Sequence, residues 1–226
     1  MPLLSIVIPV FNEVNTIREI LGRIQAISVD KEIIVVDDGS SDGTDKILRD
    51  LRYDNLKVIH HTTNRGKGAA FLTGLSHARG DLVIIQDADL EYSPEEYPKL
   101  LSAFRERGAE LVLGARFTHG YTGLYLHRLG NRFLTGLLNI LFGAHLNDLE
   151  TCYKLASRNT WQELNLKGTG FNIDPEIVCS ALKKKKRILE VPVSYHPRTY
   201  KEGKKIRWGD GLLHIVYIVK YRFTDS

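Results

Sequence analysis

The amino-acid sequence predicts an α/β protein with a mostly parallel central sheet and helices on both faces. Short apolar, β-branched runs alternate with longer segments in which apolar residues recur every three or four positions, as buried strands and amphipathic helices require. Each of the first four runs also ends in a short polar loop, which is typical of strand–helix units. A chain of 226 residues with 43% hydrophobic residues suits one large domain.

The first two strand–helix units lie in the first fifty residues. Residues 3–10 (LLSIVIPV) predict a strand, and residues 15–27 predict a helix, because isoleucine or leucine recurs along one helical face. Residues 32–36 predict the second strand. It leads into DDGSSDGT, whose glycines and short polar side chains favour a tight turn before the next helix.

Two more strands follow in the same pattern. Residues 56–60 predict the third strand, NRGKG at 64–68 begins a helix, and residues 82–85 (LVII) predict a central strand. Parallel strands end at one edge of the sheet, so charged residues from four strand ends are expected to share one crevice. They are Glu13, Asp38, Arg65, Lys67, Asp87 and Asp89. The alternative is that these loops are polar only because most surface loops are.

A metal site is predicted directly after the fourth strand, in the sequence QDADLEY. Asp87 and Asp89 lie one residue apart at the carboxyl end of that strand. Carboxylates there provide hard oxygen ligands for Mg²⁺ or Mn²⁺, and Glu91 is a third candidate ligand. The alternative is a solvated junction between strand and loop.

The second half of the chain predicts further elements. Ser93 is expected to cap a helix whose first residue is Pro94. Short strands are expected at 111–113, ending near Arg116, at 152–156 (CYKLA) and at 188–193.

Two apolar helices are predicted, at 126–142 and at 211–221, with Asp210 capping the second. Arg128 and Arg132 share a face of the first, four residues apart. Both helices are too short to span a bilayer, so we expect either core helices or helices lying in a membrane interface.

Composition restricts the function and the compartment. Lys plus Arg number 31 against 27 Asp plus Glu, a net charge of +4 that is too small to indicate nucleic-acid binding. It suits an anionic substrate or a membrane surface. Cys152 and Cys179 have no metal-ligand spacing and predict packing roles in a reducing compartment, so we expect a cytoplasmic protein, peripheral on the membrane at most. The sequence does not indicate an oligomeric state.

The ordered motifs resemble a known family. IVIPVFNE, VVDDGSSDGT, NRGKGAA, GDLVIIQDADLEY and GARF are similar to motifs of inverting family-two glycosyltransferases with the GT-A fold, a Rossmann-like nucleotide-diphospho-sugar transferase fold. NDLETCYK, GFNIDPEI and VPVSYHPRTYKEGKKI resemble the branch that contains dolichyl-phosphate mannose synthase and other polyprenyl-phosphate glycosyltransferases. The resemblance implies a single domain over residues 1–226, with a nucleotide-sugar half (1–117) and an acceptor half (118–226).

The resemblance also implies roles for particular residues. The nucleoside would lie against Pro9, Phe11, Glu13, Val36 and Asp38, while Asp87, Ala88 and Asp89 would hold the nucleotide and the metal. Glu91 occupies a position where relatives often place a further ligand. Phosphate would be bound by Arg116, Arg198 and Lys204, and the acceptor phosphate would lie near Arg128 or Arg132.

These roles imply metal-dependent, inverting transfer of a hexose from GDP-mannose or UDP-glucose to a polyprenyl or dolichyl phosphate at the cytoplasmic membrane face. A saccharide hydroxyl acceptor would need a base, for which Asp148 or Glu150 is the candidate. A lipid phosphate is already largely ionised at neutral pH, so the many basic residues after Arg116 favour a phosphate acceptor. An inactive nucleotide-binding scaffold is the non-enzymatic alternative.

Overall fold

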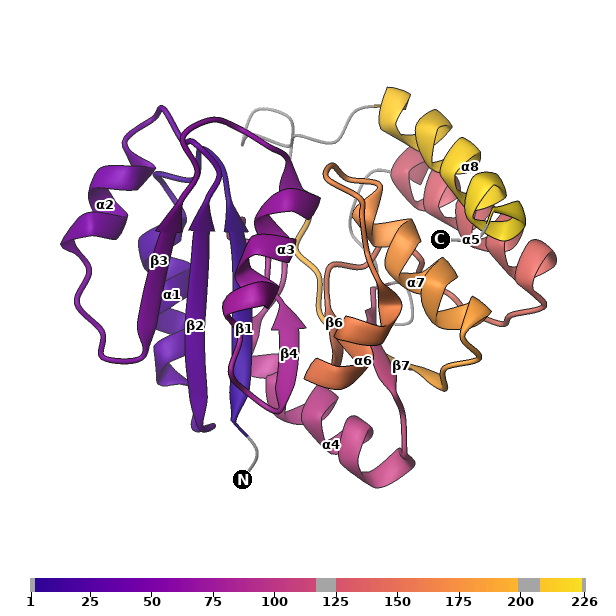
Figure 1. The fold of residues 1–226 in the computed structure, drawn as a ribbon, viewed down its shortest axis with the longest axis horizontal. Coiled ribbons are helices and arrows are strands. Elements are labelled where there is room, and N and C mark those ends of the chain that lie inside the picture. Colours follow the sequence, from indigo (N-terminus) through magenta and orange to yellow (C-terminus); the bar gives the residue numbers. More distant parts are fainter. Residues whose placement is uncertain (1–2, 117–124, 199–207, 225–226) are drawn as a thin grey trace.

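The structure is a computed structural model that describes residues 3–116, 125–198 and 208–224 (Figure 1). Among these residues, the strands form one sheet in the order β3, β2, β1, β4, β6, β5, β7. Their bounds are Leu4–Val10 (β1), Lys31–Asp37 (β2), Leu56–His60 (β3), Leu82–Ile85 (β4), Leu111–Ala115 (β5), Lys154–Ser157 (β6) and Ile188–Pro192 (β7).

The predicted mostly parallel sheet is confirmed. β3, β2, β1 and β4 pair in parallel, as do β5 and β7. β6 is antiparallel to β4 and to β5, so it begins at the edge where its neighbours end. The segment before β6 therefore reaches the same edge of the sheet as the loops after β1, β2, β4 and β5.

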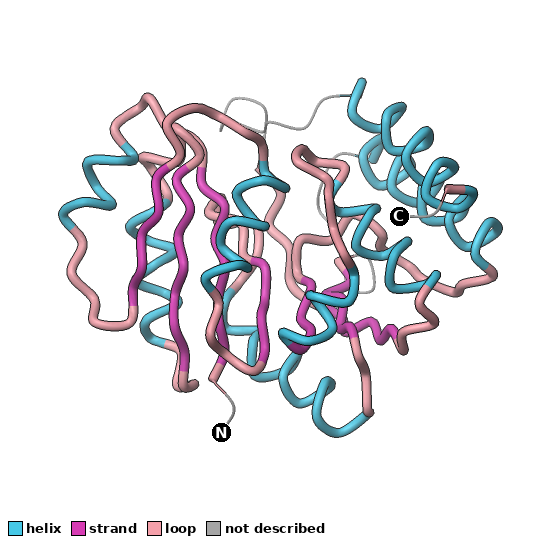
Figure 2. Tube along the Cα trace, viewed as in Figure 1, coloured by secondary structure: helices cyan, strands magenta, loops and turns pink. Residues whose placement is uncertain are grey.

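Helices cover both faces of the sheet, as predicted. In Figure 1, α3 crosses in front of the sheet and α1 lies behind it. α5, α7 and α8 pack against one another as a group at one end of the molecule (Figure 2). The bounds are Ile17–Ala26 (α1), Thr44–Asp50 (α2), Lys67–His77 (α3), Tyr97–Arg107 (α4), Tyr125–Phe142 (α5), Arg158–Leu164 (α6), Ile173–Lys183 (α7) and Trp208–Phe223 (α8).

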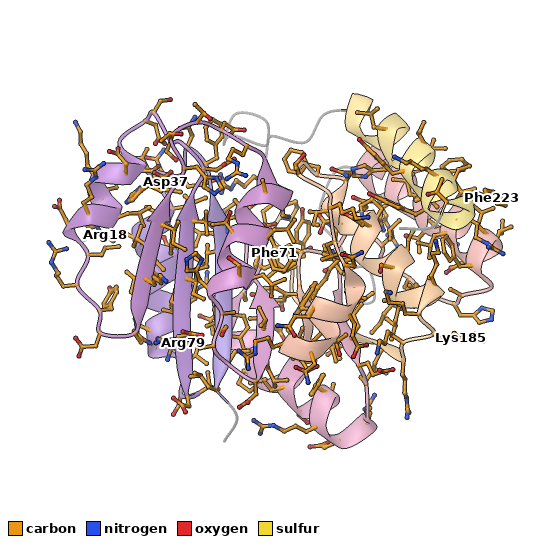
Figure 3. The ribbon with its side chains drawn as sticks, viewed as in Figure 1. Arg18, Asp37, Phe71, Arg79, Lys185 and Phe223 are labelled. Carbon is orange, nitrogen blue, oxygen red and sulfur yellow. The ribbon has the colours of Figure 1, made fainter. Side chains whose placement is uncertain are left out.

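A continuous core joins the early and late parts of the chain. The central strands β1, β2 and β4 are buried on both faces, which explains their unbroken apolar sequences. Phe71 of α3 lies near the middle of the molecule (Figure 3). It packs edge-to-face against Trp161 of α6, with ring centroids 5.1 Å apart. The Trp161 indole nitrogen donates to the Val83 carbonyl of β4 at 3.0 Å. Cys152 and Cys179 are both buried and free of disulfides.

Two predicted helix starts differ in detail. Ser93 does precede a helical turn that begins at Pro94, but that turn is a 3₁₀ turn (Pro94–Glu96) and the Ser93 side chain makes no capping hydrogen bond; α4 follows the turn. α8 begins at Trp208, which places Asp210 inside the helix and not before it. In the part of the chain that is described, no helix has the length and apolarity needed to cross a membrane.

One glycine sets how closely α3 approaches the sheet. A Cβ atom added at Gly74 would lie 2.3 Å from Val7 Cγ1 and 3.3 Å from Val36 Cγ2, both in the buried core.

We expect Gly74→Ala to lower the free energy of unfolding by about 1–3 kcal/mol, because α3 must move away from β1 and β2. Gly22 in α1 has no atom within 4 Å of an added Cβ. Gly22→Ala, the control, should stabilise the protein by up to about 1 kcal/mol. Urea unfolding of both variants tests this prediction, and equal effects would contradict it.

Candidate active site

A pocket of about 370 Å³ opens at the edge where the parallel strands end. We call it the strand-end pocket. It crosses the sheet from the loop after β2, past β1 and β4, to the segment before β6. Most of the predicted site residues line it, as the strand-end argument anticipated. They are Pro9, Phe11, Glu13, Asp38, Lys67, Asp87, Ala88, Asp89, Glu91, Arg116, Glu150 and Arg198.

Alternating charges connect the centre of the pocket to the protein interior. Lys67 Nζ lies 3.0 Å from Asp87 and 3.4 Å from Asp174, and Asp174 accepts a 2.6 Å hydrogen bond from Lys154. Burial disfavours the Lys67 ammonium, but Asp174 and Asp87 outweigh it and hold the pKa of Lys67 well above its usual range. Burial likewise opposes ionisation of Asp174, but Lys154 and Lys67 lower its pKa. Lys67 and Asp174 are therefore both charged at neutral pH.

Arg198 joins the loops around the acidic motif. Its guanidinium donates to the Glu13 carboxylate at 2.7 Å and to the Asp89 carbonyl at 2.6 Å. Its backbone N–H donates to one Glu91 oxygen at 2.7 Å, and the Tyr195 hydroxyl donates to the other at 2.6 Å. Glu91, predicted as a metal ligand, thus has both oxygens engaged in holding the 195–198 segment. Its role as a ligand remains a prediction.

The environment of Asp89 disfavours its ionised form. Burial, with Asp87 and Glu91 adding repulsion, raises the pKa of Asp89 to about 7, although Arg198 opposes the shift. One Asp89 oxygen accepts from the Glu91 backbone N–H at 3.1 Å, across Leu90, whose φ is 63°. This grouping of acids would be stabilised by a cation.

Asp38 shapes the loop that follows β3. Its carboxylate accepts from the backbone N–H groups of Arg65 at 3.0 Å and Gly66 at 2.7 Å, and contacts His61 Nδ1 at 2.6 Å. The structure thus places Asp38 at the pocket wall with its oxygens already bonded to the protein. The Arg65 side chain is exposed and does not line the pocket.

Two other predicted nucleotide-binding residues are not found in the pocket. Val36 is fully buried in β2 and faces Gly74 of α3, so its side chain cannot contact a ligand in the pocket. Lys204 lies outside the described residues.

Asp148, one of two candidate bases, is fully buried and paired with Arg116. Its two oxygens accept from Arg116 Nε and Nη2, both at 2.7 Å, and the Arg116 backbone N–H donates to it at 3.0 Å. The guanidinium also lies over the Tyr195 ring, 5.1 Å from its centroid. A carboxylate held in this way is poorly placed to take a proton from an acceptor, which disfavours a base role. Glu150, the other candidate, lines the pocket and contacts His214 Nδ1 at 3.0 Å.

Arg128 and Arg132 lie in a separate groove on α5. The groove is also lined by Asn131, Thr135 and Asn147, and has a volume of about 350 Å³. Both arginines are exposed at the groove, whereas Asn131 is buried. The structure therefore does not bring Arg128 and Arg132 into the strand-end pocket itself.

Sequence reasoning missed three residues that shape the pocket. Lys154 is fully buried. The carboxylate that balances its charge belongs to Asp174, twenty residues later, so the local sequence does not indicate a buried lysine. Tyr195 connects Glu91 to Arg116. The sequence did contain a signal for His214. It is the one histidine in the apolar segment LLHIVYIVKY, and a polar residue in such a segment indicates a buried polar contact.

We predict that Asp89→Asn changes how stability depends on pH. A carboxyl whose folded pKa is raised to about 7 contributes stability at acidic pH and loses it as the pH rises through that value. In EDTA, the wild type should therefore lose about 1 kcal/mol of stability relative to Asp89→Asn between pH 6 and pH 8. Asp54→Asn, at an exposed aspartate, is the control. Chemical denaturation at both pH values tests this, and parallel curves for wild type and Asp89→Asn would contradict it.

Comparisons with known proteins agree with this geometry. The model of "Glycosyl transferase family 2" matches residues 5–164. The chain is 32% identical to the polyprenol monophosphomannose synthase of Mycolicibacterium smegmatis, covering 85% of this chain and 77% of that protein. It is 32% identical to the undecaprenyl-phosphate mannosyltransferase of Micrococcus luteus, covering 88% and 85%. It is 31% identical to the low-salt glycan biosynthesis hexosyltransferase Agl6 of Haloferax volcanii, covering 96% of this chain but only about half (53%) of that protein.

Solved structures support the fold. Glucosyl-3-phosphoglycerate synthase from Mycobacterium tuberculosis, in complex with phosphoglyceric acid, superposes with a TM-score of 0.76 at 21% identity, covering all of this chain and 81% of that one. The same enzyme in complex with Mn²⁺, uridine diphosphate and phosphoglyceric acid gives a TM-score of 0.75 at 20% identity, covering 100% and 80%. The predicted GT-A fold is therefore confirmed. With this fold and the match to residues 5–164, the chain belongs to glycosyl transferase family 2.

Proposed function

We propose that this protein transfers a hexose, with inversion, from a nucleotide sugar to a polyprenyl phosphate at a membrane surface. One observation carries the proposal: an acidic pocket and an arginine-lined groove lie on two sides of the segment 146–150. Glu150 lines the pocket, whereas Leu146 and Asn147 line the groove. Two substrates bound in these sites would meet near this segment. Three relatives support the acceptor class, since their names specify polyprenol, undecaprenyl-phosphate and dodecaprenyl-phosphate.

The strand-end pocket would bind the donor. Asp87 and Asp89 supply carboxylate oxygens suited to Mg²⁺ or Mn²⁺. Burial and repulsion from Asp87 and Glu91 raise the pKa of Asp89, and a bound cation would oppose both effects. In the described part of the chain, no group of three or more His, Cys, Asp or Glu side chains has the arrangement of a metal site. The donor diphosphate would therefore have to complete the coordination. The structure of glucosyl-3-phosphoglycerate synthase in complex with Mn²⁺ and uridine diphosphate, which has the same fold, supports this assignment.

When bound, the cation would neutralise negative charge on the departing diphosphate. Lys67 and Arg198, which flank Asp87 and Asp89, would add positive charge on the same side. The pairing of Arg198 with Glu13 also fixes the loop after β1, so the nucleoside end of the pocket would be set before the donor arrives.

The α5 groove would bind the acceptor phosphate. Arg128 and Arg132 present guanidinium groups at its surface. Asn131 lies between these two arginines in the sequence, and its side chain is buried. Its Nδ2 has no hydrogen-bond partner among the described residues. A phosphate would satisfy that donor and both cations. An ionised phosphate needs no base, which agrees with the burial of Asp148 in its pair with Arg116.

The outer faces of α5 and α8 would rest on the membrane. Both helices expose large apolar side chains, among them Phe133 (61% exposed), Ile140 (83%) and Val216 (61%). Arg128, Arg132 and Lys220 are exposed on the same two helices, as suits an anionic lipid surface. The polyprenyl chain of the acceptor would then remain in the lipid while its phosphate occupies the groove.

A transfer assay tests the proposed function. The protein is incubated with Mg²⁺ or Mn²⁺, radiolabelled GDP-mannose or UDP-glucose, and a short-chain polyprenyl phosphate, and we expect a lipid-linked sugar. Arg128→Gln and Arg132→Gln should each raise the KM for the lipid phosphate about tenfold, because a charge-assisted hydrogen bond is lost. Donor affinity should not change. Absence of lipid-linked sugar with every donor would refute the proposal and favour an inactive nucleotide-binding scaffold.

A vesicle-binding assay tests the membrane contact. Phe133→Ser combined with Val216→Ser should weaken binding to anionic vesicles more than tenfold, since each side chain loses about 1–2 kcal/mol of apolar burial. Lys46→Ser serves as the control, because α2 lies at the opposite end of the sheet (Figure 1). Equal vesicle binding by the double variant and the wild type would contradict a membrane contact through α5 and α8.

A further inference from the structure

A largely buried polar pair lines the strand-end pocket beside β6, beyond β4 from Asp38 in strand order. Glu150 comes from the segment before β6, and His214 comes from α8. His214 Nδ1 lies 3.0 Å from Glu150 Oε1, and the two side chains are only 6% and 16% exposed. Both line the pocket together with Phe171 and Cys152. The mechanism described above uses neither residue.

The order of the strands indicates which part of a donor would reach this pair. Asp38 follows β2, Asp87 and Asp89 follow β4, and Glu150 precedes β6. In the sheet, β2, β1, β4 and β6 are successive neighbours. A nucleotide sugar with its nucleoside at the β2 end and its diphosphate at the β4 end would therefore place its hexose beside β6, against Glu150 and His214.

The chemistry of the pair suits a sugar. Glu150 accepts hydrogen bonds, and an imidazole whose Nδ1–H is bonded to a carboxylate is fixed in one orientation and one tautomer. Phe171, which also lines the pocket, adds an apolar surface. Hydroxyl groups of a hexose can donate to the carboxylate and bond to the imidazole. Sites built on such hydrogen bonds discriminate strongly against a sugar whose hydroxyl is missing or turned away.

The pair is also held in place from outside the pocket. The Glu150 backbone N–H donates to Asn131 Oδ1 at 3.3 Å, and the Leu149 N–H donates to Thr135 Oγ1 at 3.1 Å. Both acceptors are buried residues of α5. On α8, Ile218 lies one turn after His214 and is fully buried. It therefore packs the helix face that carries His214 against the core. Two helices therefore position two side chains at one end of the pocket.

We propose that Glu150 and His214 form the element that recognises the hexose of the donor and determines which epimer is bound. This inference rests on the proposed function, since it assumes a nucleotide sugar in the strand-end pocket. It assigns to Glu150 a specificity role in place of the base role that a hydroxyl acceptor would require.

Binding measurements with epimeric donors test the inference. Dissociation constants are measured by calorimetry, with Mg²⁺, for GDP, GDP-mannose and GDP-glucose, and for UDP, UDP-glucose and UDP-galactose. We expect the wild type to prefer one hexose on its nucleotide. Glu150→Gln and His214→Phe should reduce this preference at least about tenfold while changing the affinity for the nucleotide alone less than about twofold. His214→Gln, which can still bond to Glu150, should retain part of the preference.

The design separates recognition from structure and from the proposed reaction. His145→Gln, at an exposed histidine outside the pocket, is the matched control and should behave as the wild type. If the preference between epimers persists in Glu150→Gln and His214→Phe, or if nucleotide affinity falls in parallel with sugar-nucleotide affinity, the inference is overturned. If the wild type shows the preference but transfers no sugar to polyprenyl phosphate, the proposed function fails while the hexose assignment stands.

Discussion

The constraint on which this site depends is the repulsion between carboxylates at the end of β4. Asp87, Asp89 and Glu91 lie within five residues, at the point where a buried strand leaves the core. Burying like charges costs several kcal/mol unless cations and hydrogen-bond donors surround them. The chain supplies these partners from distant elements: Lys67 at the start of α3, and Arg198 after β7.

The charge pattern continues inward because Lys67 itself needs more than one partner. Asp174 in the first turn of α7 faces Lys67, and the buried Lys154 of β6 balances Asp174. Removing one member would leave an unpaired charge in the interior, which costs more than the pair contributes. The acidic motif therefore fixes where α3, α7, β6 and the segment after β7 must lie, and so defines the walls of the pocket.

The sequence was a good guide to features that depend on local pattern. Unbroken apolar runs identified β1, β2 and β4, and the position of QDADLEY after such a run located the centre of the pocket. The rule that parallel strands end together then brought Glu13, Asp38 and Lys67 to the same edge.

Features that depend on tertiary partners could not be predicted in this way. Nothing near Asp148 in the sequence indicates that Arg116, 32 residues earlier, occupies both of its oxygens. The local sequence likewise does not reveal that Val36 faces a glycine of α3 and not the pocket. Ser93 and Asp210 fit the composition of helix caps, but Ser93 precedes its helical turn without a side-chain capping bond, and the earlier start of α8 places Asp210 inside the helix.

The helices α5 and α8 combine two kinds of surface. Their outer faces expose apolar residues such as Ile140 and Val216, whereas their inner faces carry the buried polar residues Asn131, Thr135 and His214. A buried polar side chain destabilises a helix-packing surface unless it finds a partner. In both helices that partner is the segment 149–150, whose backbone contacts α5 and whose Glu150 side chain contacts α8.

Different elements hold the two sides of the strand-end pocket. Asp38 and the loop after β3 form its wall beside β2. Glu150, His214 and the arginine groove all depend on α5 and α8, which also pack against each other. The contacts of α5 and α8 therefore set the positions of His214, of the Glu150 backbone and of the arginine-lined groove together. Under the proposed function, these two helices would position both the hexose of the donor and the phosphate of the acceptor.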